Sequence, residues 1–121
     1  MSQFNFPGGA TVTSLSASAS QASTVTGAAV DLLAYEGPVA IVQNHGAGTG
    51  TLDGKIQDSA DGSTGWADVA GAAFASSTTT ADIQKLVLQS KQVKRFIRYV
   101  GTIVTGPQNV AVDLIGIKKS V

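Results

Sequence analysis

The chain has 121 residues, which is enough for one domain and little else. Eight Lys and Arg balance eight Asp and Glu, so the formal net charge is +0, and the chain lacks the cationic surplus on which dedicated nucleic-acid and anionic-membrane binders depend. Charged residues make up only 13% of the chain and cysteine is absent, which excludes disulfides and Cys-based zinc sites and favours a surface partly covered by partners.

No stretch of the sequence approaches the roughly 18 to 20 apolar residues that a membrane span requires. The beginning of the chain, Met1 to Pro7, lacks the cationic region and apolar core of a secretory signal. We therefore expect a soluble protein that stays inside the cell that makes it, with no membrane partner.

The first part of the chain differs in composition from the rest. Thr11 to Thr26 is mostly Ser, Ala and Thr, and such a segment buries too little apolar surface to offset its ordering entropy in a lone chain. It is either a first strand lying on the domain or an arm held by a neighbouring subunit, with Phe4 and Phe6 as anchors. We predict a combination: an extended N-terminal arm over residues 1–9 and a single domain over 10–121, with a strand beginning near Ala10.

The remainder divides into short β-compatible runs separated by Gly, Asp, Asn and Pro. Turn signals stand at 36–38, 46–50, 59–65 and 105–108. Short strands at about ten-residue spacing are typical of an all-β antiparallel β-sandwich or jelly roll. The runs cover residues 28–34, 39–44, 51–58, 66–69, 96–104 and 109–117, and 73–75 either continues the fourth run or pairs near it.

Alternation is clearest in the last run, where Val110, Val112 and Leu114 should face one side and the residues between them the other. The segment 81–100 is ambiguous, because its apolar residues also fit a helical stripe. The Thr run before it and the β-branched residues after it favour strands over 83–88 and 93–104, joined by a turn at Ser90–Gln92.

Features that could carry catalysis or cofactor binding are weak. His45 is the only imidazole and no G-x-S-x-G motif is present, so a structural or solvated histidine is favoured over a member of a dispersed triad. The stretch Gly46–Gly50 is followed by a strand-like run and lacks the Gly-Lys-Ser/Thr of a phosphate loop, so it predicts a strand connection that uses glycine for positive φ.

The acidic residues at 53, 58, 61 and 68 do not have the spacing of a calcium loop, since position 60 is Ala. We expect Asp58 and Asp61 to bond the backbone of their own turn. No metal, cofactor or catalytic residue is predicted.

The one basic and aromatic segment contains Lys94, Arg95 and Arg98, with Phe96 and Tyr99 among them. Such a segment occurs in single-strand nucleic-acid platforms, but the zero net charge and the lack of a second basic run argue against a nucleic-acid partner. A sheet strand whose guanidinium groups pair with carboxylates, within the domain or across an interface, is favoured.

Two segments resemble small β-sandwich proteins of tailed bacteriophages. Among these, the sequence pattern is most similar to that of the capsid decoration, or cement, proteins. The first contains Asp58-Ser59, Asp61-Gly62, Trp66 and Val69, and the second is Arg95-Phe96-Ile97-Arg98. The resemblance spans about residues 36 to 118 and leaves the arm unaccounted for. Here the aspartates and Gly62 are expected to form the turn, and Trp66 to fill the core.

The resemblance implies a non-enzymatic virion protein, made in the host cytoplasm, that binds the outside of the assembled shell. Its partners would be the major capsid protein and copies of itself. Phe4, Phe6, Lys94, Arg95 and Arg98 are the candidate contact residues. Another virion part, such as a tail, neck or fibre subunit, is the alternative. A carbohydrate-binding sandwich is a further alternative, because discoidin-like sugar-binding domains have a similar pattern.

Overall fold

The computed structural model describes residues 10–21, 24–89, 92–105 and 107–118. They form strands and turns with the 3-10 helix η1 (Leu32–Ala34), and these residues contain no α-helix. The all-β class predicted from the sequence is therefore confirmed. The strands are β1 (Ala10–Gln21), β2 (Val25–Thr26), β3 (Val30–Asp31), β4 (Tyr35–His45), β5 (Thr51–Ser59), β6 (Ala67–Ala73), β7 (Asp82–Leu88), β8 (Phe96–Val104) and β9 (Gln108–Lys118).

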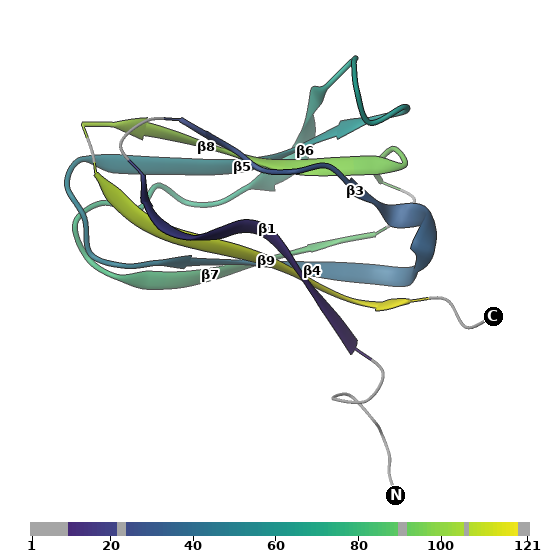
Figure 1. Cartoon of the computed structure of the whole chain (residues 1–121), viewed down its shortest axis with the longest axis horizontal. Coiled ribbons are helices and arrows are strands. Elements are labelled where there is room, and N and C mark those ends of the chain that lie inside the picture. Colours follow the sequence, from purple (N-terminus) through teal and green to yellow (C-terminus); the bar gives the residue numbers. More distant parts are fainter. Residues whose placement is uncertain (1–9, 22–23, 90–91, 106, 119–121) are drawn as a thin grey trace, which may run out of the picture.

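The strands form two antiparallel sheets that pack face to face (Figure 1). Sheet A has the order β1-β9-β4-β7, and sheet B has the order β2-β8-β5-β6, with β3 also paired to β8. The pairing is nested, because β1 pairs with β9, β2 and β3 with β8, β4 with β7, and β5 with β6. One long antiparallel hairpin rolled into two layers has this path, which is the topology of a jelly roll.

The core lies between the two sheets and consists mainly of aliphatic side chains. In β9, Val110, Val112 and Leu114 face the core and the residues between them face outward, as the alternation predicted. Burying side chains of this size contributes about 1.5 to 3 kcal/mol each before the entropy cost. The largest fully buried aliphatic side chains come from both sheets: Leu15, Ile41, Leu52, Ile56, Ile97 and Leu114.

The core also contains one fully buried aromatic ring, that of Tyr99 on β8. Two glycines, Gly54 on β5 and Gly101 on β8, are paired directly opposite each other beside this ring. A Cβ atom at either position would lie within 2.8 Å of the Tyr99 hydroxyl oxygen, closer than real Cβ contacts. The paired glycines therefore provide the space into which the tyrosine side chain extends.

Two predictions for the middle of the chain were wrong in detail. The run 28–34 is a strand only at Val30–Asp31, because η1 follows immediately and Asp31 caps it by accepting a hydrogen bond from the backbone N–H of Leu33. The turn expected at 36–38 lies inside β4, where the pairing with β9 is irregular between Glu36 and Ala40. A proline is tolerated at such an irregularity, since no regular ladder bond is required there.

The segment 81–100 forms strands β7 and β8 rather than a helix, as the β-branched residues around it indicated. The backbone N–H of Gln92 donates to the carbonyl of Gln89 in the turn between them. Ser90 and Lys91, the other expected turn residues, lie outside the described residues.

Strand β1 begins at Ala10 and pairs along β9, so the predicted start of the first strand is confirmed. Its anchor in the core is Leu15, which is 2% exposed. The expected arm, including Phe4 and Phe6, falls outside the described residues. Pairing with β9 provides backbone hydrogen bonds for a strand that has few large apolar side chains of its own.

Candidate functional site

The candidate contact residues of the second resembling segment lie at the start of β8. Lys94 and Arg95 precede the strand and are exposed, whereas Arg98 lies on the outward side of β8 and is half-buried. The ammonium group of Lys94 forms no ion pair within the described residues, but both arginines have partners. Phe4 and Phe6 lie outside the described residues.

Arg95 forms a bidentate ion pair with Asp31 on β3. Its Nε and Nη2 atoms donate to the two carboxylate oxygens at 2.9 and 2.8 Å, and its Cζ atom lies 5.0 Å from the Phe96 ring centroid. The hydrogen bonds from Arg95 hold the pKa of Asp31 below its usual value, and Asp31 in turn raises the pKa of Arg95. The guanidinium–carboxylate pairing expected for this segment thus occurs within the domain at Arg95, whereas Arg98 bonds the amide oxygen of Gln57 instead of a carboxylate.

Arg98 begins a chain of polar contacts across the outer face of sheet B. Its Nε and Nη2 atoms donate to Oε1 of Gln57 at 3.0 and 2.8 Å, and Nε2 of Gln57 donates to Asp68 at 2.9 Å. Lys55 donates to the other oxygen of Asp68 at 3.0 Å. The hydrogen bond from Gln57, followed by that from Lys55, lowers the pKa of Asp68. The charged groups of Lys55, Asp68 and Arg98 are therefore hydrogen-bonded to one another, directly or through Gln57.

The prediction that Trp66 fills the core was wrong. Trp66 lies immediately before β6 and is half-buried, and the Arg98 guanidinium carbon lies 4.4 Å from its ring centroid. The ring packs on a cation that belongs to the outer face of sheet B. The buried aromatic rings of the described core are those of Tyr35, Phe74 and Tyr99, and the centroids of the last two lie 6.2 Å apart.

The loop between β5 and β6 is organised by Asp61. Its Oδ1 atom accepts from the backbone N–H groups of Ser63 and Thr64, both at 2.9 Å, and Oδ2 accepts from the Thr64 hydroxyl at 2.9 Å. The backbone bond from Thr64, then that from Ser63, holds the pKa of Asp61 far below its usual value. The expectation that Asp61 bonds its own turn is confirmed, and Gly62 has the positive φ of 79° that such a turn uses.

Asp58 was expected to bond the same turn, and this was wrong. It is buried at the end of β5, and its Oδ2 atom accepts a 3.0 Å hydrogen bond from the backbone N–H of Lys94. This bond ties the β5–β6 hairpin to the turn before β8. Together with the contact of Arg98 on Trp66, it joins the two resembling segments into one structural unit.

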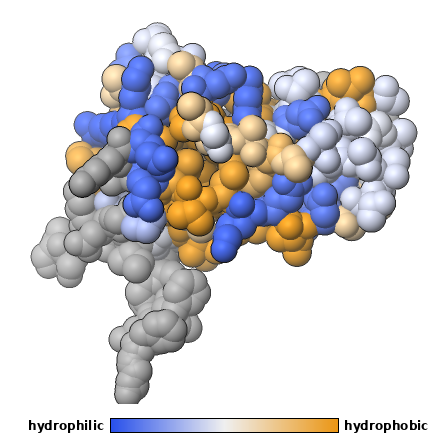
Figure 2. Space-filling model, turned by 180° about the vertical axis from the view of Figure 1, so that it is seen from behind, coloured by the Kyte–Doolittle hydropathy of each residue, from blue (hydrophilic) through white to orange (hydrophobic). Residues whose placement is uncertain are grey.

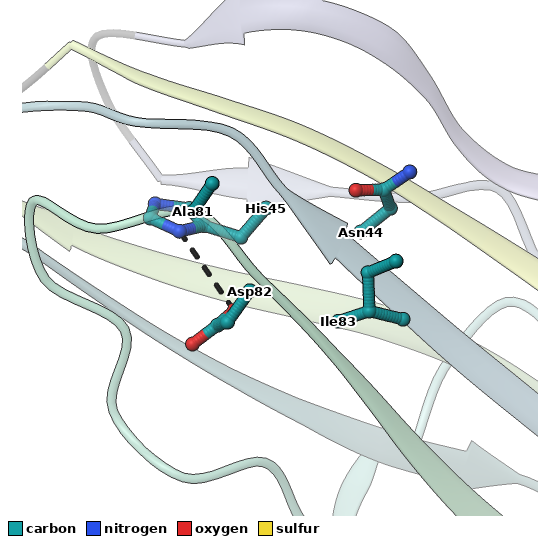
Figure 3. A pocket seen from close by; sticks show the side chains of 5 residues that line it. All are labelled: Asn44, His45, Ala81, Asp82 and Ile83. Carbon is teal, nitrogen blue, oxygen red and sulfur yellow. Dashed lines mark ion pairs between the residues drawn. The ribbon is translucent and has the colours of Figure 1, made fainter.

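His45 lies at the end of β4 and is fully buried, as expected for a structural histidine. Its Nε2 atom is hydrogen-bonded to Oε1 of Gln108, and Nδ1 lies 3.8 Å from Oδ1 of Asp82, as drawn in Figure 3. The Ser77 hydroxyl is 3.2 Å from the Asp82 oxygens instead of contacting the imidazole. This order of contacts differs from that of a nucleophilic triad, in which the histidine bonds the hydroxyl.

A shallow pocket beside His45 is lined by Asn44, His45, Ala81, Asp82 and Ile83.

The glycine-rich stretch after His45 is the strand connection that the sequence predicted. Gly50 has φ of 83° and leads into β5, and a Cβ there would collide with the backbone of Thr105. Gln108 closes the connection by donating a 2.6 Å hydrogen bond to the Thr49 carbonyl. The stretch is thus built around contacts to its own sheet neighbours.

Across the described ranges, no group of three or more histidine or acidic side chains is arranged to hold a metal ion. In the same residues, no helix is long and apolar enough to cross a membrane.

A further surface feature was missed by the sequence analysis. Ile83 and Val87 fit a helical core stripe in the sequence, but on β7 they point away from the sandwich and are exposed. From the side opposite to Figure 1, hydrophobic side chains also gather in the middle of the molecule between hydrophilic ones (Figure 2). Alternation along β7 could not identify its outward face, because both faces of the strand carry apolar and polar side chains.

No protein-family model and no curated protein sequence matches the chain.

Proposed function

We propose that the protein is a non-enzymatic capsid decoration protein of a tailed bacteriophage, resident on the outside of the virion. It binds the assembled shell at junctions between major capsid subunits and stabilises that shell. The observation that carries the proposal is the unit formed by the β5–β6 hairpin and the start of β8. The residues that resemble decoration proteins meet in this unit through the Asp58–Lys94 and Trp66–Arg98 contacts.

The jelly-roll topology and the composition support the proposal. Jelly rolls are common among viral capsid domains, although they also occur in lectins, so this support is an analogy at the level of the fold. With charged residues at 13% of the chain, a large part of the surface suits repeated contacts with other subunits.

The contact surface we propose is the end of the sandwich where β1 begins and β9 ends (Figure 1). Strand β1 begins at this end with Ala10, next to Ile117 of β9, and the arm with Phe4 and Phe6 precedes it in the sequence. The turn before β8 also lies here, since the Arg95 carbonyl accepts from the N–H of Leu32 in η1. The free ammonium of Lys94 is therefore available at the end where the arm begins.

Arg95 and Arg98 take a different part in the proposal. Each is hydrogen-bonded within its own domain, so each positions the contact surface more than it supplies free charge to the shell. The stabilising effect is thermodynamic. A protein that binds only the assembled, expanded shell shifts the equilibrium toward that state by mass action.

The test is the copy number of this chain in purified virions of the phage that encodes it, relative to the major shell protein, by quantitative mass spectrometry. A ratio near one, or a simple fraction of it, supports decoration of the shell. A few copies per particle would instead assign the protein to the tail or neck. Its absence from particles would overturn a virion function altogether.

A further inference from the structure

The outer face of sheet A carries a row of aliphatic side chains that crosses every strand of that sheet. The strand register gives the row as Val12, Ile115, Ala40 and Val87. Val12 and Val87 are 63% and 53% exposed, and Ile83, on the same side of β7, is 69% exposed. The outer face of sheet B differs in character: Val104, at the end of β8, is 58% exposed, but the middle of the face holds the charged side chains of Lys55, Asp68 and Arg98, which contact one another or Gln57.

The next row of sheet A places two unlike charges on opposite sides of β4. Register aligns Val42 with Asp113 of β9 on one side and with Lys85 of β7 on the other. Two strand spacings of about 4.8 Å separate the charged residues, about 10 Å in all. Within the described part of the chain, neither charged group has a hydrogen bond or an ion pair.

This arrangement is complementary to itself. A two-fold axis that runs nearly parallel to β4, above the outer face, exchanges the positions of β9 and β7 in two facing sheets. Asp113 then lies opposite Lys85 of the partner subunit, and Ile115 lies opposite Val87 of the partner subunit. Val42 lies opposite its own copy, and so does Ala40. Both small apolar residues lie on the axis, where two sheets approach most closely.

We infer that the outer face of sheet A binds a second copy of the chain, face to face, about a two-fold axis along β4. The interface is isologous, so each dimer contains the Asp113–Lys85 contact twice. The twist of packed sheets makes their strands cross at about 30°, so the axis runs close to the direction of β4 rather than strictly parallel to it. The two facing sheets therefore contact each other best near Val42, in the row that contains Asp113 and Lys85.

The size of the face sets the strength of this association. With the axis on β4, strands β9, β4 and β7 of one copy face those of the other and β1 lies outside the overlap, so three strands about 4.8 Å apart and five residues at about 3.4 Å each give a face of roughly 14 by 17 Å. Such an area lies well below that of stable interfaces, so we expect a weak dimer with a dissociation constant of high-micromolar order. The inference does not depend on capsid binding, and it is tested on the isolated protein.

The first test reverses the charges and measures association of the full chain by sedimentation equilibrium from about 1 μM to about 1 mM. Lys85→Glu or Asp113→Lys alone places like charges opposite each other, so each should weaken the dimer about tenfold or more. The double variant restores opposite charges across the axis and should recover the wild-type association. Asp53→Lys makes the same charge change on the exposed face of β5 in sheet B and should have no effect.

Three results would overturn the inference. The wild-type chain could remain monomeric throughout this range, the double variant could stay as weak as the singles, or Asp53→Lys could weaken association as much as Asp113→Lys. Circular dichroism of each variant checks that its fold is retained.

A second test uses the absence of cysteine from the chain. Val42→Cys places a thiol on the two-fold axis, so a short bis-maleimide should join two chains through residue 42. Asp53→Cys, on the outer face of sheet B, is the matched control and should give only the collisional background. Equal yields of cross-linked dimer from the two variants would contradict the face-to-face geometry even if a reversed charge impaired folding.

Discussion

The hydroxyl of Tyr99 donates a 2.6 Å hydrogen bond to the side-chain oxygen of Gln43, and this bond connects the two sheets through the middle of the core. Tyr99 belongs to β8 of sheet B and Gln43 to β4 of sheet A, and both side chains are fully buried. Burial raises the pKa of the Tyr99 hydroxyl well above its usual value, so it remains a donor at neutral pH. The bond therefore joins the two sheets by a polar contact inside a mainly apolar core.

We predict that Tyr99→Phe lowers the free energy of unfolding by about 1 to 3 kcal/mol, because the Gln43 oxygen loses its donor in a site that water does not reach. The amide nitrogen of Gln43 already lacks a partner within the described residues, so the whole amide group would then be unsatisfied. Urea denaturation at neutral pH measures the change.

A double-mutant cycle separates this effect from a general loss of packing. Gln43→Leu removes the other partner, and the double variant contains no orphaned polar group, so its loss should be smaller than the sum of the single losses. Additive losses would mean that the bond contributes nothing beyond packing.

The loop between β5 and β6 should make stability depend on pH in the acid range. The folded pKa of Asp61 is depressed, so its contribution is fully present above the usual aspartate value of about 3.9 and is lost as pH falls through the folded pKa. We predict that Asp61→Asn lowers the urea midpoint at pH 6 and that this deficit shrinks as pH falls below about 4.

Asp53→Asn is the matched control, because that carboxylate is exposed on β5 and makes no hydrogen bond within the described residues. The urea midpoint of Asp53→Asn should differ from that of the wild type by the same amount at every pH. A deficit of Asp61→Asn that stays constant with pH would show that the charge of Asp61 does not stabilise the turn.

The contact between Arg98 and Trp66 should be visible in fluorescence, since Trp66 is the only tryptophan. Arg98→Ala uncovers the indole ring, so its emission should move to longer wavelength and acrylamide should quench it more strongly. The lost cation–π contact is worth about 0.5 to 1 kcal/mol at an exposed site. Lys94→Ala, which removes a cation that does not touch the ring, should leave the spectrum unchanged, and a red shift in both variants would contradict this assignment.

Local patterns predicted those parts of the fold that depend on local chemistry. The alternation of Val110, Val112 and Leu114 identified the inner face of β9, and the Asp61 turn followed from side-chain bonding to nearby backbone. The continuation of β4 through Glu36 and Pro38 was missed, because the pairing that tolerates a proline there comes from β9, far away in the sequence.

The surroundings of the candidate site were harder to predict for the same reason. Trp66 was assigned to the core because large aromatic rings are usually buried, but which cation it meets depends on Arg98, on a different strand. Asp58 was assigned to its own turn, although its partner is the backbone of Lys94. The charge pattern on sheet A becomes visible only when β9, β4 and β7 are aligned in register.

The N-terminal arm gives the last prediction. Deleting residues 1–9 should leave the melting temperature unchanged, because the anchor of β1 is Leu15 and its pairing with β9 starts at Ala10. Binding to purified shells that lack the protein should fall at least tenfold in a co-sedimentation assay if Phe4 and Phe6 are the anchors, and Phe4→Ser with Phe6→Ser in the full chain should reproduce that loss. Ser2→Ala with Asn5→Ala is the control that keeps both rings. Undiminished binding by the truncated chain would exclude the arm from the contact, whereas a lower melting temperature would mean that residues 1–9 pack on their own domain.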